Sequence, residues 1–377
     1  MNKLREIIRR EIGPCGAISF ARFMELSLYC PEFGYYERLA NTPGRGGDFY
    51  TSVSAGSLFG RLLAFQFARW IEETGLERFQ LIEAGAHDGR LALDVLNWFQ
   101  SRRPDLLEKL QYGVLEPSLR RQRWQEKALN PFAARVRWFD SWEKVRRHGV
   151  RGVIFSNELL DAMPVHRWAW DAHGRKWFEW GVAVEGAHFV WQRMPTARES
   201  AVESPESKMF SPHRADCVPG FDLPAGLLAV LPDGFAAEIC PAAVEWWRQA
   251  ASALKCGRLL TFDYGLTAEE FFLPQRAQGT LRACHRHRLS DDLLANVGEQ
   301  DLSAHVNFTA LQSAGESAGL KNEGLFSQTE FLTRIAEAAW KARSVFGDWT
   351  PDLARQFQTL THPEHLGRRF RALIQAR

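Results

Sequence analysis

Residues 81–91 form the segment of this chain whose residue types and spacing best suit cofactor chemistry. An apolar run ends in the acid Glu83, the chain turns through Gly85 and Gly89, and a helix-like stretch begins near Arg90. Because glycine lacks a Cβ atom, the backbone can take positive φ and approach a ligand closely, while free N–H groups of the first helical turn point the same way. This strand–turn–helix pattern predicts the seat of a nucleotide-type cofactor.

The charge beside this turn indicates which cofactor it would hold. The glycines are spaced G-x-x-x-G rather than G-x-G-x-x-G, and Glu83 would repel a pyrophosphate. S-Adenosylmethionine (SAM) carries a cationic ammonium and a cationic sulfonium, which Glu83 would attract. The motif therefore favours SAM over a nicotinamide dinucleotide, and an ordinary turn whose glycines serve only packing is the alternative.

Two further acids follow strand-like runs in the order expected around such a cofactor. Glu116 ends the run 110–116, at the distance where an acid that binds ribose hydroxyls is expected, and Asp140 follows the run 135–139 as a candidate for the adenine amino group. Ligands of open α/β sheets bind at the carboxyl ends of the strands. We therefore expect Glu83, Glu116 and Asp140 to line one cofactor site.

A polar cluster after the next run is placed for a second substrate. The run 152–157 ends in Asn157, and Glu158 and Asp161 follow it three residues apart. On a helical turn that spacing puts both carboxylates on one face, where they could clamp a guanidinium, and Asn157 could orient a nitrogen nucleophile. A helix start whose acids favour the positive end of its dipole is the alternative. Asp263, after a further run, adds a carboxylate beside the same crevice.

The motifs of two other enzyme classes are missing from the sequence. It contains no H-E-x-x-H or Walker pattern, which removes support for zincin and P-loop functions. The segment 284–287, together with His305, resembles a metal set, but Arg286 and Arg288 crowd it with positive charge and no second cysteine lies at ligand spacing. We expect no metal.

Strand-like and helix-like segments alternate through most of the chain. The apolar runs are 79–83, 110–116, 135–139, 152–157 and 258–263. Their alternation with helical patterns predicts a doubly wound α/β sheet. The segment 165–193 has the pattern of a β-hairpin, whose tryptophans either pack on the core or face a partner, and 370–374 could form a last edge strand. We expect an amino-terminal helical part at 1–75 and a core at 76–377 with insertions at about 165–235 and 266–305.

Composition limits the classes of partner. The 377 residues carry 47 Lys and Arg against 45 Asp and Glu, a net charge of +2 that is too balanced for a protein that coats nucleic acid. No apolar stretch is long enough to cross a bilayer, the first residues lack the core of a signal peptide, and the cysteines are scattered as in reduced proteins. We expect a cytoplasmic protein without nucleic-acid partner or membrane insertion, and the sequence leaves a homo-oligomer open.

Collinear motifs along nearly the whole chain resemble those of a known family. They are the tyrosine-rich 29–36, the G-D-F-x-T-S loop within 44–52, the glycine turn 83–91, N-E-x-x-D-A-x-P at 157–164, D-Y-G at 263–265, and the carboxyl-half segments 279–282, His287, 298–308 and 328–332. The set is similar to the MidA family of SAM-dependent methyltransferases, whose mitochondrial members are protein arginine methyltransferases needed for assembly of respiratory complex I.

This resemblance implies a class I methyltransferase with a Rossmann-like core, SAM as its cofactor and a protein arginine as acceptor. Glu158 and Asp161, with Asn157, would orient the guanidinium and help to remove its proton, with Asp48 and Asp263 as supporting acids. The glycines, acid and aromatic residue of the loop 46–52 predict a cover over the cofactor. Within this loop Gly47, Asp48 and Thr51 are the candidate cofactor contacts.

The chain also departs from the family pattern. His87 stands where glycine is usual, the residues after Ser52 lack the usual carboxylate, and Asn307 stands where Asp is common. These changes motivate an alternative function, a non-catalytic SAM-binding assembly factor with a methyltransferase fold. A nicotinamide-dependent oxidoreductase is a weaker alternative, because Glu83 and the glycine spacing argue against it.

Overall fold

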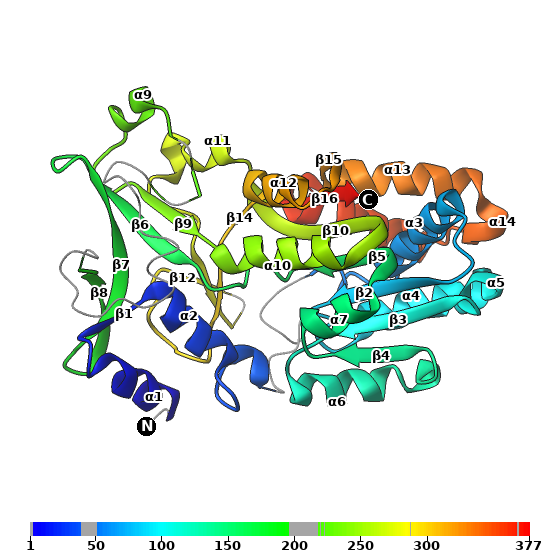
Figure 1. Ribbon diagram of the computed structural model, residues 1–377, viewed down its shortest axis with the longest axis horizontal. Helices are drawn as coiled ribbons and strands as arrows, with labels where there is room; N and C mark the ends of the chain where they lie inside the picture. Colours follow the sequence, from blue (N-terminus) through cyan, green and yellow to red (C-terminus); the bar gives the residue numbers. More distant parts are fainter. Residues whose placement is uncertain are drawn as a thin grey trace. The chain divides into compact units, whose positions relative to one another are not determined.

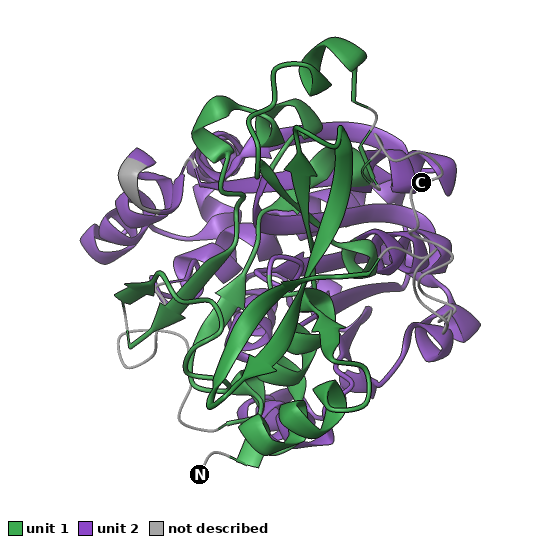
Figure 2. Cartoon of the chain, turned by 90° about the vertical axis from the view of Figure 1, so that its left-hand side faces the viewer, with its two compact units in different colours: residues 1–41, 162–243, 266–310 green, residues 42–161, 244–265, 311–377 purple. Residues whose placement is uncertain are grey.

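A computed structural model describes residues 3–38, 51–195, 218, 220–221, 223–286, 288–367 and 369–377 (Figure 1). The chain divides into two compact units, coloured separately in Figure 2. Unit 1 comprises 1–41, 162–243 and 266–310, and unit 2 comprises 42–161, 244–265 and 311–377. Compactness does not decide where a folding domain begins, so the boundary expected near residue 75 stays a prediction.

Unit 2 is built on a sheet with the strand order β15-β16-β10-β5-β2-β3-β4. The strands are β2 (Phe79–Ala84), β3 (Leu110–Leu115), β4 (Val136–Phe139), β5 (Val150–Asn157), β10 (Leu254–Leu266), β15 (Lys321–Ser327) and β16 (Phe370–Ala376). The five strands from β10 to β4 pair in parallel, and β16 is antiparallel to both of its neighbours. This order confirms the predicted α/β sheet. The order in which successive strands are added to the sheet reverses between β2 and β5, so ligands are expected at the carboxyl ends of these two strands.

Helices connect these strands. They are α3 (Leu58–Thr74), α4 (Arg90–Arg102), α5 (Pro104–Leu107), α6 (Leu119–Ala128), α7 (Trp142–His148), α10 (Pro241–Ala253), α12 (Phe308–Ser317), α13 (Gln328–Lys341), α14 (Arg343–Phe346) and α15 (Pro351–Thr361), with short turns η2 (Asn130–Phe132) and η4 (Pro363–Gly367). Aromatic side chains fix α3 on the sheet, since Phe59 lies 5.2 Å from Phe262 of β10 and Phe67 lies 5.0 Å from Phe155 of β5 between ring centroids. Burial of such large apolar groups supplies most of the stabilisation of the sheet.

The last strand differs from its prediction. The run 370–374 was expected at an edge, but β16 lies between β10 and β15 and is buried over most of its length. Residues 321–327 add the outer strand, whose pattern of burial is mostly exposed or half-exposed. The edge prediction is wrong because β15 pairs with β16 along six residue pairs, a contact that the local pattern does not encode.

Unit 1 contains an antiparallel sheet in the order β1-β7-β6-β9, with β8 paired to β7, and a small sheet β12-β11-β13. Its elements are α1 (Lys3–Ile12), β1 (Ala17–Ser19), α2 (Phe20–Tyr29), η1 (Tyr35–Glu37), β6 (His166–Asp171), β7 (Lys176–Glu185), β8 (His188–Arg193), α9 (Ala225–Leu228), β9 (Ala236–Ile239), α11 (Ala268–Phe271), η3 (Pro274–Arg276), β11 (Arg282–His285), β12 (Arg288–Ser290), β13 (Asp301–Ser303) and β14 (Val306–Asn307). The predicted hairpin is confirmed as β6–β7. Its Trp168, Trp170 and Trp177 pack in the core, whereas Trp180 and Trp191 are half-buried.

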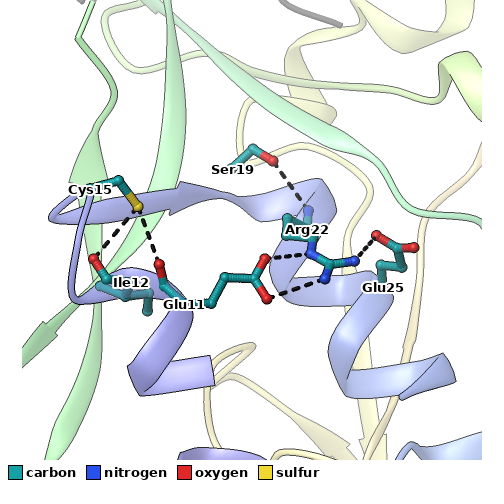
Figure 3. Close-up of polar contacts among 6 residues, drawn as sticks. All are labelled: Glu11, Ile12, Cys15, Ser19, Arg22 and Glu25. Carbon is teal, nitrogen blue, oxygen red and sulfur yellow. Dashed lines mark hydrogen bonds and ion pairs between the residues drawn. The ribbon is translucent and has the colours of Figure 1, made fainter. Parts of the chain in front are cut away.

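Polar contacts hold the first two helices of unit 1 together (Figure 3). Nε of Arg22 on α2 donates to the carboxylate of Glu11 on α1 at 2.5 Å, and Nη1 donates to Glu25 at 2.7 Å. Oγ of Ser19 accepts the backbone N–H of Arg22 at 3.2 Å and caps α2. This N-cap is the usual role of serine before a helix, because the first backbone donors lack intrahelical partners.

Candidate active site

The glycine turn lies at the switch point of the unit 2 sheet. Ala84, the last residue of β2, pairs with Ser156 of β5, so the turn begins beside the end of β5. Gly85 and Gly89 have φ of 72° and 83°. His87 has φ of 45°, a left-handed conformation that a side chain disfavours. The turn therefore has the backbone that the sequence predicted, with a histidine in a position that suits glycine.

Glu83 is buried just before the turn. Its side chain is 3% exposed, and the hydroxyl of Tyr112 on β3 donates a hydrogen bond to its carboxylate. Burial is the main cause that raises the pKa of Glu83, the Tyr112 hydrogen bond opposes the rise and the negative charge of Asp88 adds to it, and the resulting pKa is about 8. Among the described residues no cation pairs with Glu83. A ligand with positive charge fits this environment.

Glu116 is also buried, at 1% exposure, directly after β3. Its Oε1 accepts the backbone N–H of Ser118 at 2.9 Å and pairs with Nη2 of Arg121 at 3.0 Å. Its Oε2 accepts from Nε2 of Gln125 at 3.2 Å. These three donors fix the carboxylate of Glu116 at the end of β3, next to the turn that follows β2.

Asp140 differs from these two acids. It follows β4 as expected, but it is exposed and pairs with Lys144 one helical turn further on. The Lys144 ammonium holds the pKa of Asp140 below its usual value. A carboxylate in water with its own cation is poorly prepared to bind a neutral amino group, so the structure gives this residue less support than Glu83 and Glu116.

The predicted loop contacts are only partly visible. Gly47 and Asp48 lie outside the described residues. Thr51 is half-buried, and its Oγ1 accepts the backbone N–H of Ser54 at 3.1 Å while its own N–H donates to Ser54 Oγ at 2.8 Å. The two side chains thus close a turn that leads into α3.

The segment after β5 is a loop rather than a helix, so both helical interpretations of Glu158 and Asp161 are wrong. Glu158 has φ of 51°, and its N–H donates to the carbonyl of Phe262 on β10 at 2.8 Å. The N–H groups that a helix would leave free are taken by tertiary partners instead. The loop also covers the glycine turn, since a Cβ atom on Gly85 would lie 2.8 Å from Cδ1 of Leu159.

A buried carboxyl pair closes this loop. Oδ2 of Asp263, which is fully buried on β10, accepts the N–H groups of Leu159 and Leu160 at 3.3 and 2.8 Å. Burial, then the charge and hydrogen bonding of Asp161, raise the pKa of Asp263 well above its usual value, and Glu158 adds to the effect. Two carboxylates this close and dry cannot both ionise easily. Burial and the neighbouring Asp161 therefore favour the protonated form of Asp263, whereas a bound cation would favour its ionised form.

Glu158 and Asn157 are held from a different direction. Oε1 of Glu158 accepts Nδ2 of Asn157 at 2.9 Å and the N–H of Ser52 at 3.3 Å. Ser52 Oγ donates to Oε1 of buried Gln328, whose Nε2 donates to the carbonyl of Leu360. Oδ1 of Asn157 is buried without a hydrogen-bond donor within the described part of the chain. The structure thus brings Asn157, Glu158, Asp161 and Asp263 together beside the glycine turn.

Three supporting residues were not among the candidate site residues, although the motif segment 328–332 includes Gln328. Tyr112 donates to Glu83, Gln125 donates to Glu116, and Gln328 supports Ser52. Apart from Gln111, Tyr112 is the one residue of strand β3 that carries a polar side-chain group, which is a signal that could have found it. Gln125 lies in a polar helix where nothing sets it apart. Within the described residues, no group of three or more metal-ligating side chains gathers.

Sequence comparison assigns the family. The family model Methyltransf_28, which describes S-adenosyl-L-methionine-dependent methyltransferases, matches residues 62–326. The chain belongs to this family. The match includes the glycine turn, Glu116 and the carboxyl cluster, and it confirms the resemblance drawn from the motifs.

Solved structures agree with this assignment. A COG1565 superfamily protein of Burkholderia thailandensis, solved with bound S-adenosyl-homocysteine, is 31% identical and aligns with a TM-score of 0.79 over 100% of this chain and 92% of its own. A native crystal structure of a COG1565 superfamily protein from the same organism is 30% identical, also with a TM-score of 0.79, over 100% and 91% of the two chains. The fold is that of a class I methyltransferase, and SAM is the cofactor of this enzyme.

Curated relatives extend along nearly the whole chain. The protein arginine methyltransferase NDUFAF7 of Danio rerio is 25% identical over 94% of this chain and 82% of its own length, and the Drosophila melanogaster homolog is 25% identical over 98% and 84%. Both names place these relatives in mitochondria. The expected cytoplasmic location is contradicted by these relatives. No helix in the described part of the chain is long and apolar enough to span a membrane.

Proposed function

We propose that this methyltransferase methylates an arginine side chain of a protein. The observation that carries the proposal is the buried pair of Asp161, in the loop after β5, and Asp263, on β10; Glu158 belongs to the same loop, which lies against the glycine turn. A desolvated cluster of carboxyl groups is stabilised by a cation, and a planar guanidinium offers several N–H donors to such a cluster. The names of the curated relatives, protein arginine methyltransferases, support this acceptor.

On the cofactor side, we assign Glu83 to the cationic part of SAM and Glu116 to the ribose hydroxyls. Gly85 and Gly89 have positive φ, which glycine adopts without strain, so the turn can present its backbone N–H groups to the cofactor. Asp140 remains a proposed adenine contact, and the cover formed by the loop of Gly47, Asp48 and Thr51 likewise remains a proposal.

On the acceptor side, the residues of the loop hold and deprotonate the arginine. When bound, SAM supplies a methyl group on a cationic sulfur. A new N–C bond forms as the S–C bond breaks, and the guanidinium nitrogen must lose a proton in the same event. Glu158 accepts that proton, Asp161 and Asp263 fix the plane of the guanidinium, and the amide of Asn157 orients the reacting nitrogen.

The acceptor class can be tested with labelled SAM. The purified protein is incubated with extract of its own organism, and labelled proteins are hydrolysed and analysed for methylated arginine. Label in methylarginine is the expected result. Label in another amino acid would contradict the arginine acceptor, and SAM binding without any label would favour the non-catalytic assembly function.

Replacement of Glu116 by alanine should weaken SAM binding. The variant loses a hydrogen-bond acceptor that is ionised and buried, which typically costs about 1.5–3 kcal/mol, or roughly 10- to 150-fold in affinity. Isothermal titration with SAM measures this loss. Asp140→Ala is the matched comparison, and its smaller expected effect follows from its exposure and its pairing with Lys144. Equal affinity of Glu116→Ala and wild type would contradict the assignment.

Replacement of Gln328 by methionine should reduce kcat without changing SAM affinity. The variant removes the acceptor for Ser52 Oγ and so loosens the backbone N–H that donates to Glu158. We expect kcat to fall up to about 10-fold, because the variant disturbs only the position of the carboxylate. Gln356→Met, which frees the N–H of Leu58 instead, serves as the control. A loss of SAM binding would place Gln328 with the cofactor.

A further inference from the structure

The side chain of Gln125 joins the ends of three neighbouring strands. It lies on α6 and is fully buried. Its Nε2 donates to the carbonyl of His87 at 3.1 Å and to Oε2 of Glu116 at 3.2 Å, while its Oε1 accepts the indole N–H of Trp138 at 3.0 Å. These partners follow β2, follow β3 and lie in β4 respectively, so one amide group connects the three ends that surround the glycine turn.

Only one orientation of this amide satisfies all of its partners. The indole of Trp138 can only donate, and the carbonyl of His87 and the ionised carboxylate of Glu116 can only accept. A reversed amide would set its oxygen against two acceptors and its NH₂ group against a donor. Trp138 therefore fixes the orientation in which Gln125 presents its N–H groups to Glu116 and His87.

Both acceptors benefit from this arrangement. His87 is held in a left-handed conformation that a non-glycine residue disfavours, and its carbonyl is anchored by Gln125. Glu116 receives Gln125 on Oε2 while Ser118 and Arg121 occupy Oε1. Gln125, which donates to Oε2, thus acts together with the donors on Oε1 to set the rotation of the Glu116 carboxylate.

We propose that Gln125 is a positioning residue that makes the cofactor site selective for the ribose hydroxyls. It holds the Glu116 carboxylate, relative to the glycine turn, in the orientation that accepts these hydroxyls. The inference rests on the proposed assignment of Glu116 to the ribose. It goes further by placing the selectivity in a residue that does not itself contact the cofactor.

The test compares two ligands that differ only in the ribose. Isothermal titration measures S-adenosylhomocysteine and its 2′-deoxyribose analogue on the wild type and on Gln125→Met. The wild type should prefer the hydroxylated ligand by about 10-fold or more, because a hydrogen bond to a charged acceptor is lost with the analogue. In Gln125→Met this preference should fall below about 3-fold, because the affinity for the hydroxylated ligand falls more than the affinity for the deoxyribose analogue.

Gln122→Met provides the matched control. Gln122 also lies on α6, but its Nε2 donates to the backbone carbonyl of Glu116 at 2.6 Å and not to its carboxylate. This variant should keep the wild-type preference even if it weakens both ligands. If Gln125→Met also weakens both ligands equally and keeps the preference, its role is merely structural and the inference is overturned.

A second variant covers the case in which Gln125→Met does not fold. Trp138→Phe keeps an aromatic ring but removes the donor that fixes the Gln125 amide. Its preference should lie between those of the wild type and of Gln125→Met, and a wild-type preference would overturn the inference. A wild-type protein that binds both ligands equally would instead refute the assignment of Glu116 to the ribose. The experiment therefore distinguishes a wrong assignment of Glu116 from a wrong role of Gln125.

Discussion

Replacement of Glu158 by glutamine should abolish most methyl transfer to protein while leaving SAM affinity within about 3-fold of the wild type. Glutamine keeps the shape of the side chain and can still accept from Asn157 and Ser52. It removes the negative charge that holds a guanidinium and accepts its proton. Loss of such a group typically lowers the rate by about 100-fold or more. Transfer of labelled methyl groups to extract protein and titration with SAM measure the two quantities separately.

The control for this variant is Glu143→Gln. Glu143 is exposed on α7 and pairs with Arg147, so its loss of charge should change neither transfer nor affinity. If Glu158→Gln loses SAM binding, Glu158 belongs to the cofactor site. If it transfers methyl groups at the wild-type rate, the proton leaves by another route and the proposed acceptor site is wrong.

The sheet that positions these residues could largely be predicted from the sequence. Strands β2, β3 and β5 are apolar runs buried on both faces, and such runs are typical of a parallel sheet. Because the carboxyl ends of parallel strands share one edge, the convergence of Glu83 and Glu116 also followed from sequence order. The position of β16 inside the sheet did not follow from sequence order, because it depends on pairing with β15, which lies more than forty residues earlier in the chain.

The local structure of the loop after β5 could not be predicted for a related reason. The spacing of Glu158 and Asp161 is compatible with a helix, and a helix would satisfy the backbone locally. In the structure the carbonyl of Phe262 and the carboxylate of Asp263 accept the backbone N–H groups of this segment instead, and Glu158 takes a positive φ. The residues were identified correctly as neighbours, but the element that brings them together is β10.

Supporting residues were the least predictable part of the site. Gln125 and Gln328 act through hydrogen bonds to residues on other elements of the fold, such as Glu116 and Ser52. A polar residue on a helix has many possible partners, and its burial depends on how that helix packs. Tertiary geometry was needed to show that Gln125 donates to the Glu116 carboxylate and that Gln328 supports Ser52, whose N–H donates to Glu158.

SAM binding should strengthen as the pH rises from 6 to 8. Burial raises the pKa of Glu83 to about 8, so the carboxyl group is mostly protonated at neutral pH in the free enzyme. A cationic ligand requires the ionised form, and its binding must release that proton. For a pKa of about 8, the dissociation constant should be roughly 50-fold higher at pH 6 than at pH 8. Titration calorimetry in buffers of different ionisation enthalpy measures both the affinity and the released proton.

Three variants separate this effect from other titrations. Glu83→Gln should bind more weakly at pH 8 and lose the pH dependence, whereas Glu77→Gln, at an exposed position before β2, should keep it. Tyr112→Phe removes a donor that favours the ionised carboxylate, so the midpoint should move to higher pH. A pH dependence that persists in Glu83→Gln would show that another group controls binding.

The same burial should be visible in the stability of the free enzyme. A carboxyl group whose pKa is higher in the folded than in the unfolded state binds more protons when folded, so its contribution is fully present below about pH 4.5 and is lost as pH rises through about 8. The loss is at most about 1.4 kcal/mol per pH unit. Thermal unfolding should therefore show Glu83→Gln more stable than the wild type at pH 8 but not at pH 5. An equal difference at both values would mean that Glu83 is ionised in the free enzyme, and its raised pKa could then not be the source of a pH-dependent affinity.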